Sequence, residues 1–102
     1  MDLTIKKNGA ETLVSLSGRL DTPAAQEAAQ KLSQIQEDAS GTIILDCKEL
    51  TYISSSGLRI FLTLRKATAS QGGRLIVKDI NDDIRAVFMM TGFLNLFEIQ
   101  ES

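Results

Sequence analysis

Three consecutive serines, Ser54, Ser55 and Ser56, stand directly before Gly57 and are the residues best placed for chemistry in this chain. They follow an apolar run at 42–47 and precede a helical pattern, so we expect them at the start of a helix. Serine hydroxyls at that position cap free backbone N–H groups. The same N–H groups stabilise an anion, and a phosphate on one hydroxyl would add about −1.5 to −2 charges. The cluster is therefore either a helix cap or a phosphorylation switch, and spacing alone leaves both open.

The chain has no histidine and one cysteine, which limits the chemistry open to these serines. Ser-His-Asp and Cys-His catalysis are excluded, and a structural zinc site lacks its usual ligands. The sequence has neither a Gly-x-Ser-x-Gly elbow nor a phosphate-binding Gly-x-x-x-x-Gly-Lys loop. Only Lys48 or Lys66 could act as a base for Ser55. We therefore expect a protein that is not an enzyme, with no metal and no cofactor.

The length of 102 residues and the apolar fraction of 43% indicate one globular domain, at residues 1–102. The net charge is −2, without the basic excess typical of nucleic-acid-binding proteins. No apolar stretch approaches the roughly 20 residues that span a bilayer. The single Cys47 allows no internal disulfide, which fits a reducing compartment. We expect a cytoplasmic protein with no nucleic-acid or membrane partner.

The first half of the chain predicts two antiparallel strands and a helix. Residues 2–7 and 12–17 alternate weakly, and the Asn-Gly pair between them is typical of a hairpin turn. Thr22 before a proline is a good N-cap. Apolar residues at helical spacing then predict a helix that ends near Asp38.

The second half alternates strands and helices. The expected elements are a buried strand at 42–47, a connection at 48–54, a helix at about 56–70, a buried strand at 74–78, a helix opened by residues 81–83 and closed at 91–92, and an apolar segment at 93–99 that ends in a short strand. This order predicts an α/β fold with a mixed sheet, in which an antiparallel N-terminal pair joins parallel strands and the helices lie mainly on one face. Residues expected in the core include Cys47, the pair Met89 and Met90, and Phe93, Leu94, Leu96 and Phe97.

Four segments together resemble a known family. The run Tyr-Ile-Ser-Ser-Ser-Gly-Leu at 52–58 resembles the signature of the STAS family, specifically of its stand-alone anti-sigma factor antagonists. Gly-Arg-Leu-Asp at 18–21 resembles the family's Gly-x-Leu-Asp. The strand at 42–47 and the third helix and turn at 85–93 also fit, so the resemblance covers nearly the whole chain in the family's order.

The resemblance implies a partner-switching protein with a STAS fold. In the family, the unmodified protein binds an anti-sigma factor that is also a serine kinase with the histidine-kinase-like ATPase fold. The kinase phosphorylates one serine, the complex dissociates, and a phosphoserine phosphatase resets the protein. The matching acceptor here is Ser55, with Ser56 and Ser54 as alternatives. Ser54 stands where many members carry Asp, so it lacks that charge and offers a competing hydroxyl.

The resemblance and the helical pattern together indicate a partner-binding surface. Besides Ser54, Ser56 and Gly57, it would include Asp21, which in the family lies near the acceptor; a simple helix-capping role for Asp21 or Thr22 is the alternative. The pattern after Gly57 adds one edge of the second helix, which we expect to be partly exposed and to contact the partner: Leu58, Leu62 and Arg65. Deep packing of this edge against the sheet and a neighbouring helix is the alternative.

A second function keeps the fold and changes the mechanism. STAS domains also serve as regulatory or scaffolding modules whose binding does not depend on phosphorylation. The acceptor-like Ser55 favours partner switching over this alternative.

Overall fold

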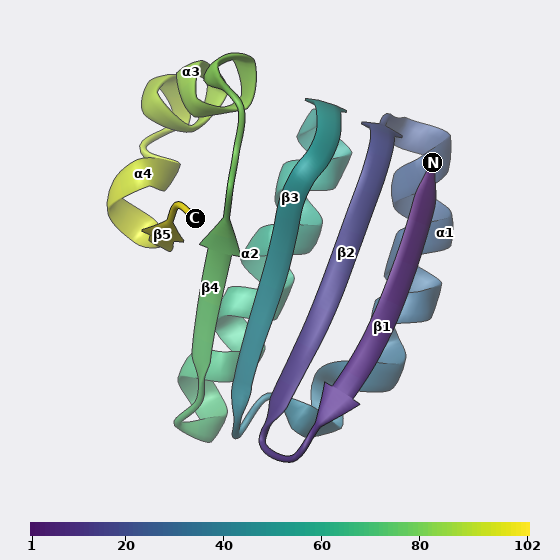
Figure 1. Ribbon diagram of the computed structural model, residues 1–102, viewed down its shortest axis with the longest axis vertical. Helices are drawn as coiled ribbons and strands as arrows, with labels where there is room; N and C mark the ends of the chain where they lie inside the picture. The colour runs from purple at the N-terminus through teal and green to yellow at the C-terminus, as the bar shows by residue number, and fades with distance from the viewer.

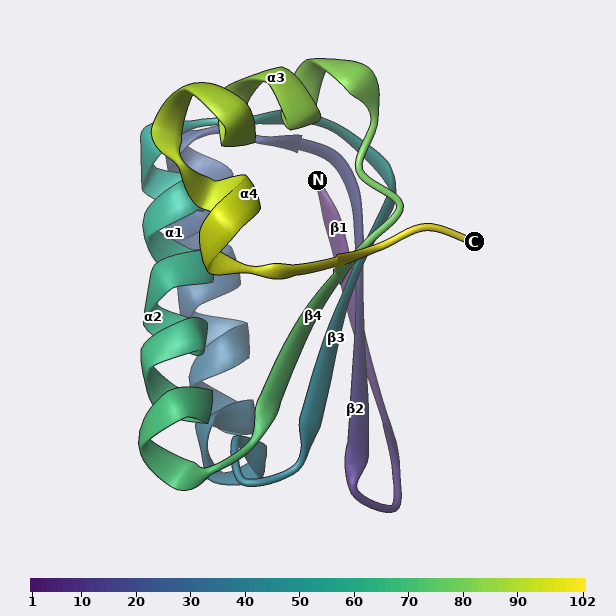
Figure 2. The same ribbon diagram turned by 90° about the vertical axis from the view of Figure 1, so that its left-hand side faces the viewer.

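The computed structural model describes residues 1–102 and shows a five-stranded sheet with its long helices on one face (Figures 1 and 2). The strands lie in the order β1-β2-β3-β4-β5, and only the β1–β2 pair is antiparallel. In chain order the elements are β1 (Asp2–Asn8), β2 (Glu11–Leu20), α1 (Thr22–Leu32), the 3-10 helix η1 (Ser33–Asp38), β3 (Thr42–Ile53), α2 (Ser55–Gln71), β4 (Arg74–Lys78), α3 (Asp82–Thr91), α4 (Phe93–Leu96) and β5 (Glu98–Gln100). The predicted α/β class with a mixed sheet is confirmed.

The hydrophobic core lies between the sheet and the two long helices α1 and α2 (Figure 2). Alternate strand residues such as Val14, Leu45 and Val77 point into this layer and are completely buried. A phenylalanine cluster extends the core to α3 and α4, and the rings of Phe61 and Phe88 meet edge to face with centroids 6.1 Å apart. This packing connects α2 to the C-terminal helices.

Strand β3 is longer than the sequence predicts, and the connection expected at 48–54 is wrong. The strand continues to Ile53 and pairs with β2 along this stretch. Its burial changes there from every second residue to every third, with Cys47, Leu50 and Ile53 inside. Two register shifts in the β2–β3 ladder accommodate this spacing. The extension carries the chain to the end of the sheet, where the serine cluster follows at once.

The helix ends follow capping chemistry, with two corrections. Asp21, not Thr22, is the N-cap of α1. The regular helix ends at Leu32, and the predicted end near Asp38 is that of the following 3-10 helix. The predicted start of α3 is confirmed, because the Asn81 side chain accepts a hydrogen bond from the backbone of that helix's first turn.

The core prediction for the methionine pair is wrong. Met89 and Met90 are 66% and 85% exposed, because α3 buries Ile84 and Phe88, one turn apart, on its opposite side. The apolar C-terminal segment also forms α4 before it reaches β5, and Leu96 at the end of α4 is 43% exposed. The other C-terminal apolar residues pack against the core as expected.

Candidate functional site

The first serine of the cluster is the N-cap of α2. Ser54 has an extended backbone, with φ −87° and ψ 171°, and its Oγ accepts a hydrogen bond from the Gly57 N–H at 3.1 Å. The same hydroxyl donates to the Leu20 carbonyl oxygen at 2.9 Å. Because the Ser54 hydroxyl both donates and accepts within the fold, Ser54 is a structural cap.

The Ser55 hydroxyl is free. Ser55 is the first residue of α2 and is exposed, whereas Ser56 is half-buried, and neither hydroxyl takes part in the side-chain hydrogen bonds of the chain. The first backbone N–H groups of a helix lack helical acceptors, and this end of the helix dipole is positive. An external kinase can therefore reach the Ser55 hydroxyl. A phosphate formed there would lie in the positive field of the helix N-terminus, which tolerates negative charge.

Asp21 lies close to the start of α2 because the end of β2 is bonded to it. The Ser54 N–H donates to the Leu20 carbonyl at 2.9 Å, to the same oxygen that accepts the Ser54 hydroxyl. The next residue, Asp21, accepts a hydrogen bond from the Ala24 N–H at 3.0 Å and caps α1. Both helices begin at the same end of the sheet (Figure 2). The capping role of Asp21 is seen directly, and its role toward a partner stays a prediction.

Gly57 lets α2 approach the sheet closely. A Cβ atom at this position would lie 2.8 Å from Ile53 Cγ1 and 2.8 Å from Leu20 Cδ2, both buried side chains of the strand ends. The glycine after the serines is therefore required by packing. This contact fixes the height at which the first turn of α2, and Ser55 with it, stands above the sheet.

The edge of α2 that the sequence predicts as partly exposed is half-buried. Leu58 and Leu62 pack against the core without being enclosed by it. Arg65, at the far end of this edge, donates from Nε to the Leu96 carbonyl at 2.9 Å and so joins α2 to the end of α4. The two leucines remain available beside Ser55, and Arg65 has a structural contact of its own.

Comparison with known families decides what kind of domain this is. The sequence model of the STAS domain matches residues 2–102. The chain belongs to the STAS domain family. The resemblance drawn from the serine motif and its flanking segments is thereby confirmed along almost the whole chain.

This STAS domain is similar in sequence to curated bacterial regulators. BtrV of Bordetella bronchiseptica, named as a candidate anti-sigma factor antagonist, is 29% identical over 102 residues, which are 100% of this chain and 88% of that protein. The anti-sigma-B factor antagonist of Bacillus subtilis is 25% identical over 99 residues, 97% of this chain and 90% of that protein.

The fold is that of SpoIIAA, a Bacillus cell fate determinant and anti-sigma factor antagonist. The structure of its unphosphorylated form has a TM-score of 0.78 at 20% identity and covers 99% of this chain and 89% of that chain. Its phosphorylated form gives a TM-score of 0.79 at 21% identity, with 99% and 91% covered. At this identity the likeness establishes the shared architecture, and function has to be argued from the site.

The structure has a hollow next to the serine cluster that the sequence did not predict. It has a volume of about 330 Å³ and lies between the ends of β2 and β3 and the first turns of α3. The Arg19 guanidinium lies over the Tyr52 ring at one side of it, 4.2 Å from the ring centroid. The two residues are cross-strand partners in the β2–β3 ladder. No sequence signal pairs them, because β3 was not expected to extend this far.

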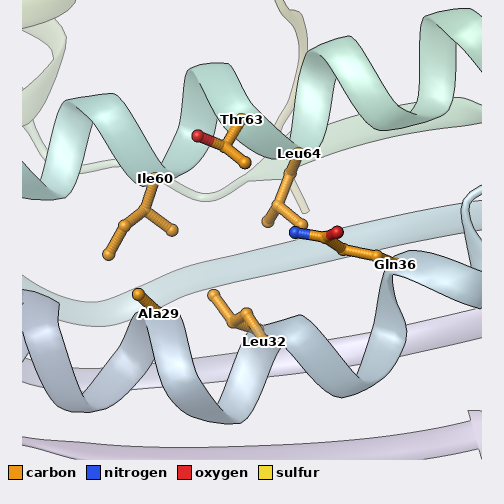
Figure 3. A pocket seen from close by; sticks show the side chains of 6 residues that line it. All are labelled: Ala29, Leu32, Gln36, Ile60, Thr63 and Leu64. Carbon is orange, nitrogen blue, oxygen red and sulfur yellow. The ribbon is translucent and has the colours of Figure 1, made fainter.

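A second, smaller depression lies between α1 and α2 (Figure 3). Its volume is about 80 Å³, and its lining is mainly apolar: Ala29, Leu32, Gln36, Ile60, Thr63 and Leu64. The side chains of the two helices point toward one another across it (Figure 3). This space is a shallow packing groove, small beside the 300 Å³ or more of common ligand pockets.

Other groups contribute no reactive centre to the site. Cys47 is buried in β3, and burial, followed by the charges of Asp46 and Asp79, raises the pKa of its thiol to about 12. The structure holds no group of three or more His, Cys, Asp or Glu side chains that could bind a metal. None of the helices is both long and apolar enough to cross a membrane.

Proposed function

We propose that this STAS domain is an anti-sigma factor antagonist that works by partner switching. In its unmodified form it binds an anti-sigma factor that is also a serine kinase of the histidine-kinase-like ATPase fold. Phosphorylation of Ser55 releases the complex, and a phosphoserine phosphatase restores the binding form. The single unpaired cysteine suits action in the cytoplasm.

The observation that supports this proposal most strongly is that the serines of the cluster differ in their hydrogen bonds and exposure. Ser54 is occupied as the helix cap by hydrogen bonds of 2.9 and 3.1 Å. Ser55 is exposed and uncommitted, and Ser56 is half-buried. A kinase therefore reaches the Ser55 hydroxyl without breaking a hydrogen bond of the fold.

A phosphate at Ser55 would change the binding surface more than the fold. It adds about −1.5 to −2 charges to a surface that already carries the Asp21 carboxylate. The free N–H groups and the dipole of α2 offset this charge for the domain itself. A partner that covers Ser55 in the unmodified complex would have to bury the phosphate or dissociate. Because burial of an uncompensated charge costs desolvation free energy, dissociation is the favoured outcome.

The names of the sequence relatives support the same role. The B. subtilis relative is an anti-sigma-B factor antagonist, and BtrV is named in the same class. Each relative matches this chain along nearly its full length. SpoIIAA, which shares the fold, exists in unphosphorylated and phosphorylated forms.

Binding of two Ser55 variants to the cognate anti-sigma factor tests the proposal. We expect Ser55→Ala to bind as the unmodified protein does and to persist in the complex when ATP is added. Ser55→Asp should lose about 2 kcal/mol or more of binding free energy, the size expected for a charge placed in a complementary interface. Isothermal titration calorimetry measures both. Ser40→Asp, the same change at an exposed serine before the start of β3 and so at the opposite end of the sheet, is the matched control.

Equal affinities of wild type, Ser55→Ala and Ser55→Asp would reject the switch. That result would leave a STAS module whose binding is independent of phosphorylation, with a regulatory or scaffolding role.

A further inference from the structure

Arg19 is held in a way that no other arginine of this chain shares. Its guanidinium carbon stands 4.2 Å from the centroid of the Tyr52 ring. Arg19 is exposed, and it takes part in none of the side-chain hydrogen bonds or ion pairs of the chain. Three other arginines use their N–H groups within the fold: Arg65, Arg74 and Arg85.

Stacking leaves the Arg19 donors free. A guanidinium that lies over an aromatic face is attracted through its flat surface, while its five N–H groups point outward in the plane. The side chain has then already lost much of its rotamer freedom, so a ligand need not order it. A planar fork of donors fits a carboxylate through two parallel hydrogen bonds. Arg19 therefore presents unpaired donors whose geometry suits a carboxylate.

The surface around Arg19 is continuous with the serine cluster. The hollow of about 330 Å³ beside it includes Ile53, the residue directly before Ser54. Tyr52 is 40% exposed, and Val87 of α3 forms part of the apolar wall. A specific interface covers about 800 Å² on each partner. A partner that covers Ser55 would therefore cover this hollow as well.

We propose that Arg19 recognises an acidic side chain of the anti-sigma factor, whose apolar neighbour fills the hollow against Ile53 and Val87. This inference rests on the proposed function and specifies the chemistry of its partner. Asp83 also lines the hollow and would repel a carboxylate, so the acidic side chain would bind on the side of Arg19, the one cation of the lining. A phosphate on Ser55 would repel the same acidic side chain, which gives release an electrostatic cause.

Titration calorimetry with the purified cognate anti-sigma factor tests this inference on the full chain. Arg19→Gln, which removes the charge, should raise Kd about tenfold or more. Arg19→Lys, which keeps the charge and loses the fork, should raise it by an intermediate factor. Lys31→Gln, the same loss of charge on an exposed residue of α1's last turn, is the control and should stay within about twofold of wild type. Circular dichroism checks that each variant is folded.

The dependence of Kd on salt separates charge recognition from packing. Wild-type affinity should fall more steeply with added salt than that of Arg19→Gln, because only wild type makes the ion pair. If folded Arg19→Gln binds within about twofold of wild type while Ser55→Asp loses binding, the Arg19 inference is overturned and partner switching stands. If wild type itself does not bind the anti-sigma factor, both proposals fail together.

Discussion

Neighbouring serines of one sequence run have different physical roles in this domain. The Ser54 hydroxyl joins two backbone groups, the Gly57 N–H and the Leu20 carbonyl, and so connects the start of α2 to the end of β2. The Ser55 hydroxyl has no such partner and faces solvent. The sequence showed that a cap and a phosphate acceptor could both lie here. Spacing alone could not say which serine is the cap, because the cap depends on where the helix begins, one residue earlier than predicted. The choice of Ser55 as acceptor came from the family resemblance and stays a prediction.

Replacement of the cap should destabilise the fold, and replacement of its neighbour should not. Ser54→Ala removes both hydrogen bonds and should lower the free energy of unfolding by about 1–2 kcal/mol. The free energy of unfolding of Ser55→Ala should stay within about 0.5 kcal/mol of wild type, because the hydroxyl that is removed is exposed and has no hydrogen-bond partner in the fold. Urea unfolding followed by circular dichroism measures both. Equal destabilisation by the two variants would mean that the cap has been placed on the wrong serine.

The thiol of Cys47 should be inert in the folded protein. Burial is the main cause that raises its pKa from 9.0 to about 12, so the reactive thiolate is scarce at neutral pH. Reaction with a disulfide reagent should be slow in buffer and fast in urea. The thiol also contributes a pH dependence: it ionises more readily in the unfolded chain, so its contribution to stability is complete below pH 9 and is lost as pH rises toward 12. Rapid labelling without denaturant would contradict the buried position.

At the scale of elements, β3 shows what a sequence pattern misses. The apolar run at 42–47 predicts a strand, and the structure confirms it. Beyond it, the buried residues Cys47, Leu50 and Ile53 recur every third residue, which is not the alternation of a regular strand. The irregular ladder with β2 makes that spacing compatible with a sheet, and such a ladder depends on the partner strand. Because the extension of β3 was not predicted, the pairing of Arg19 with Tyr52 could not be predicted either.

The first turn of α2 depends on a glycine for its distance from the sheet. In an ordinary helix Gly→Ala stabilises by about 0.5–1 kcal/mol. At Gly57 the added Cβ would lie 2.8 Å from both Ile53 and Leu20, and overpacking costs about 1–3 kcal/mol. We expect Gly57→Ala to lower the urea midpoint, with Ser56→Ala as the neighbouring control. A Gly57→Ala variant more stable than wild type would contradict the close approach.

Helix α3 is connected to the strand that leads to the site through one side chain. Asn81 Oδ1 accepts from the Ile84 N–H at 2.8 Å and caps the helix, while Nδ2 donates to the Leu50 carbonyl at 3.1 Å. Asn81→Ala removes both bonds and should cost about 1–2 kcal/mol of unfolding free energy. Asn81→Asp keeps the cap and loses the donor, so chemical unfolding should place it between wild type and Asn81→Ala. An Asn81→Asp protein as unstable as Asn81→Ala would assign the effect to the bond with β3 alone.

The molecule as a whole separates a buried core from its outer surface. The core between the sheet and the helices α1 and α2 was largely predictable, because it follows periodicity along each element. The outer surface was less so. Met89 and Met90 are apolar and were expected in the core, yet both are exposed. The side of α3 that packs against the core carries Ile84 and Phe88 instead. The residues that line the hollow come from β2, β3 and α3, and only the fold brings them together.

This separation predicts that a negative charge at Ser55 leaves the fold intact. Ser55→Asp places a carboxylate at the first residue of α2, where the helix dipole favours it by about 0.3–1 kcal/mol. Thermal unfolding should therefore show the same or a slightly higher midpoint than wild type, even though partner binding is lost. A marked fall in the midpoint would mean that release reflects unfolding and not a change of surface.

Mapping of the phosphorylation site by mass spectrometry shows whether Ser55 is the phosphoacceptor. The protein would be incubated with its anti-sigma factor kinase and ATP and then cleaved after Lys48 and Arg59, which releases all three serines in one peptide. Fragment ions distinguish the three hydroxyls. We predict phosphate on Ser55 and none on Ser54, whose hydroxyl is bonded within the fold. Phosphate on Ser54 or Ser56, or none at all with an active kinase, would show that Ser55 is not the acceptor.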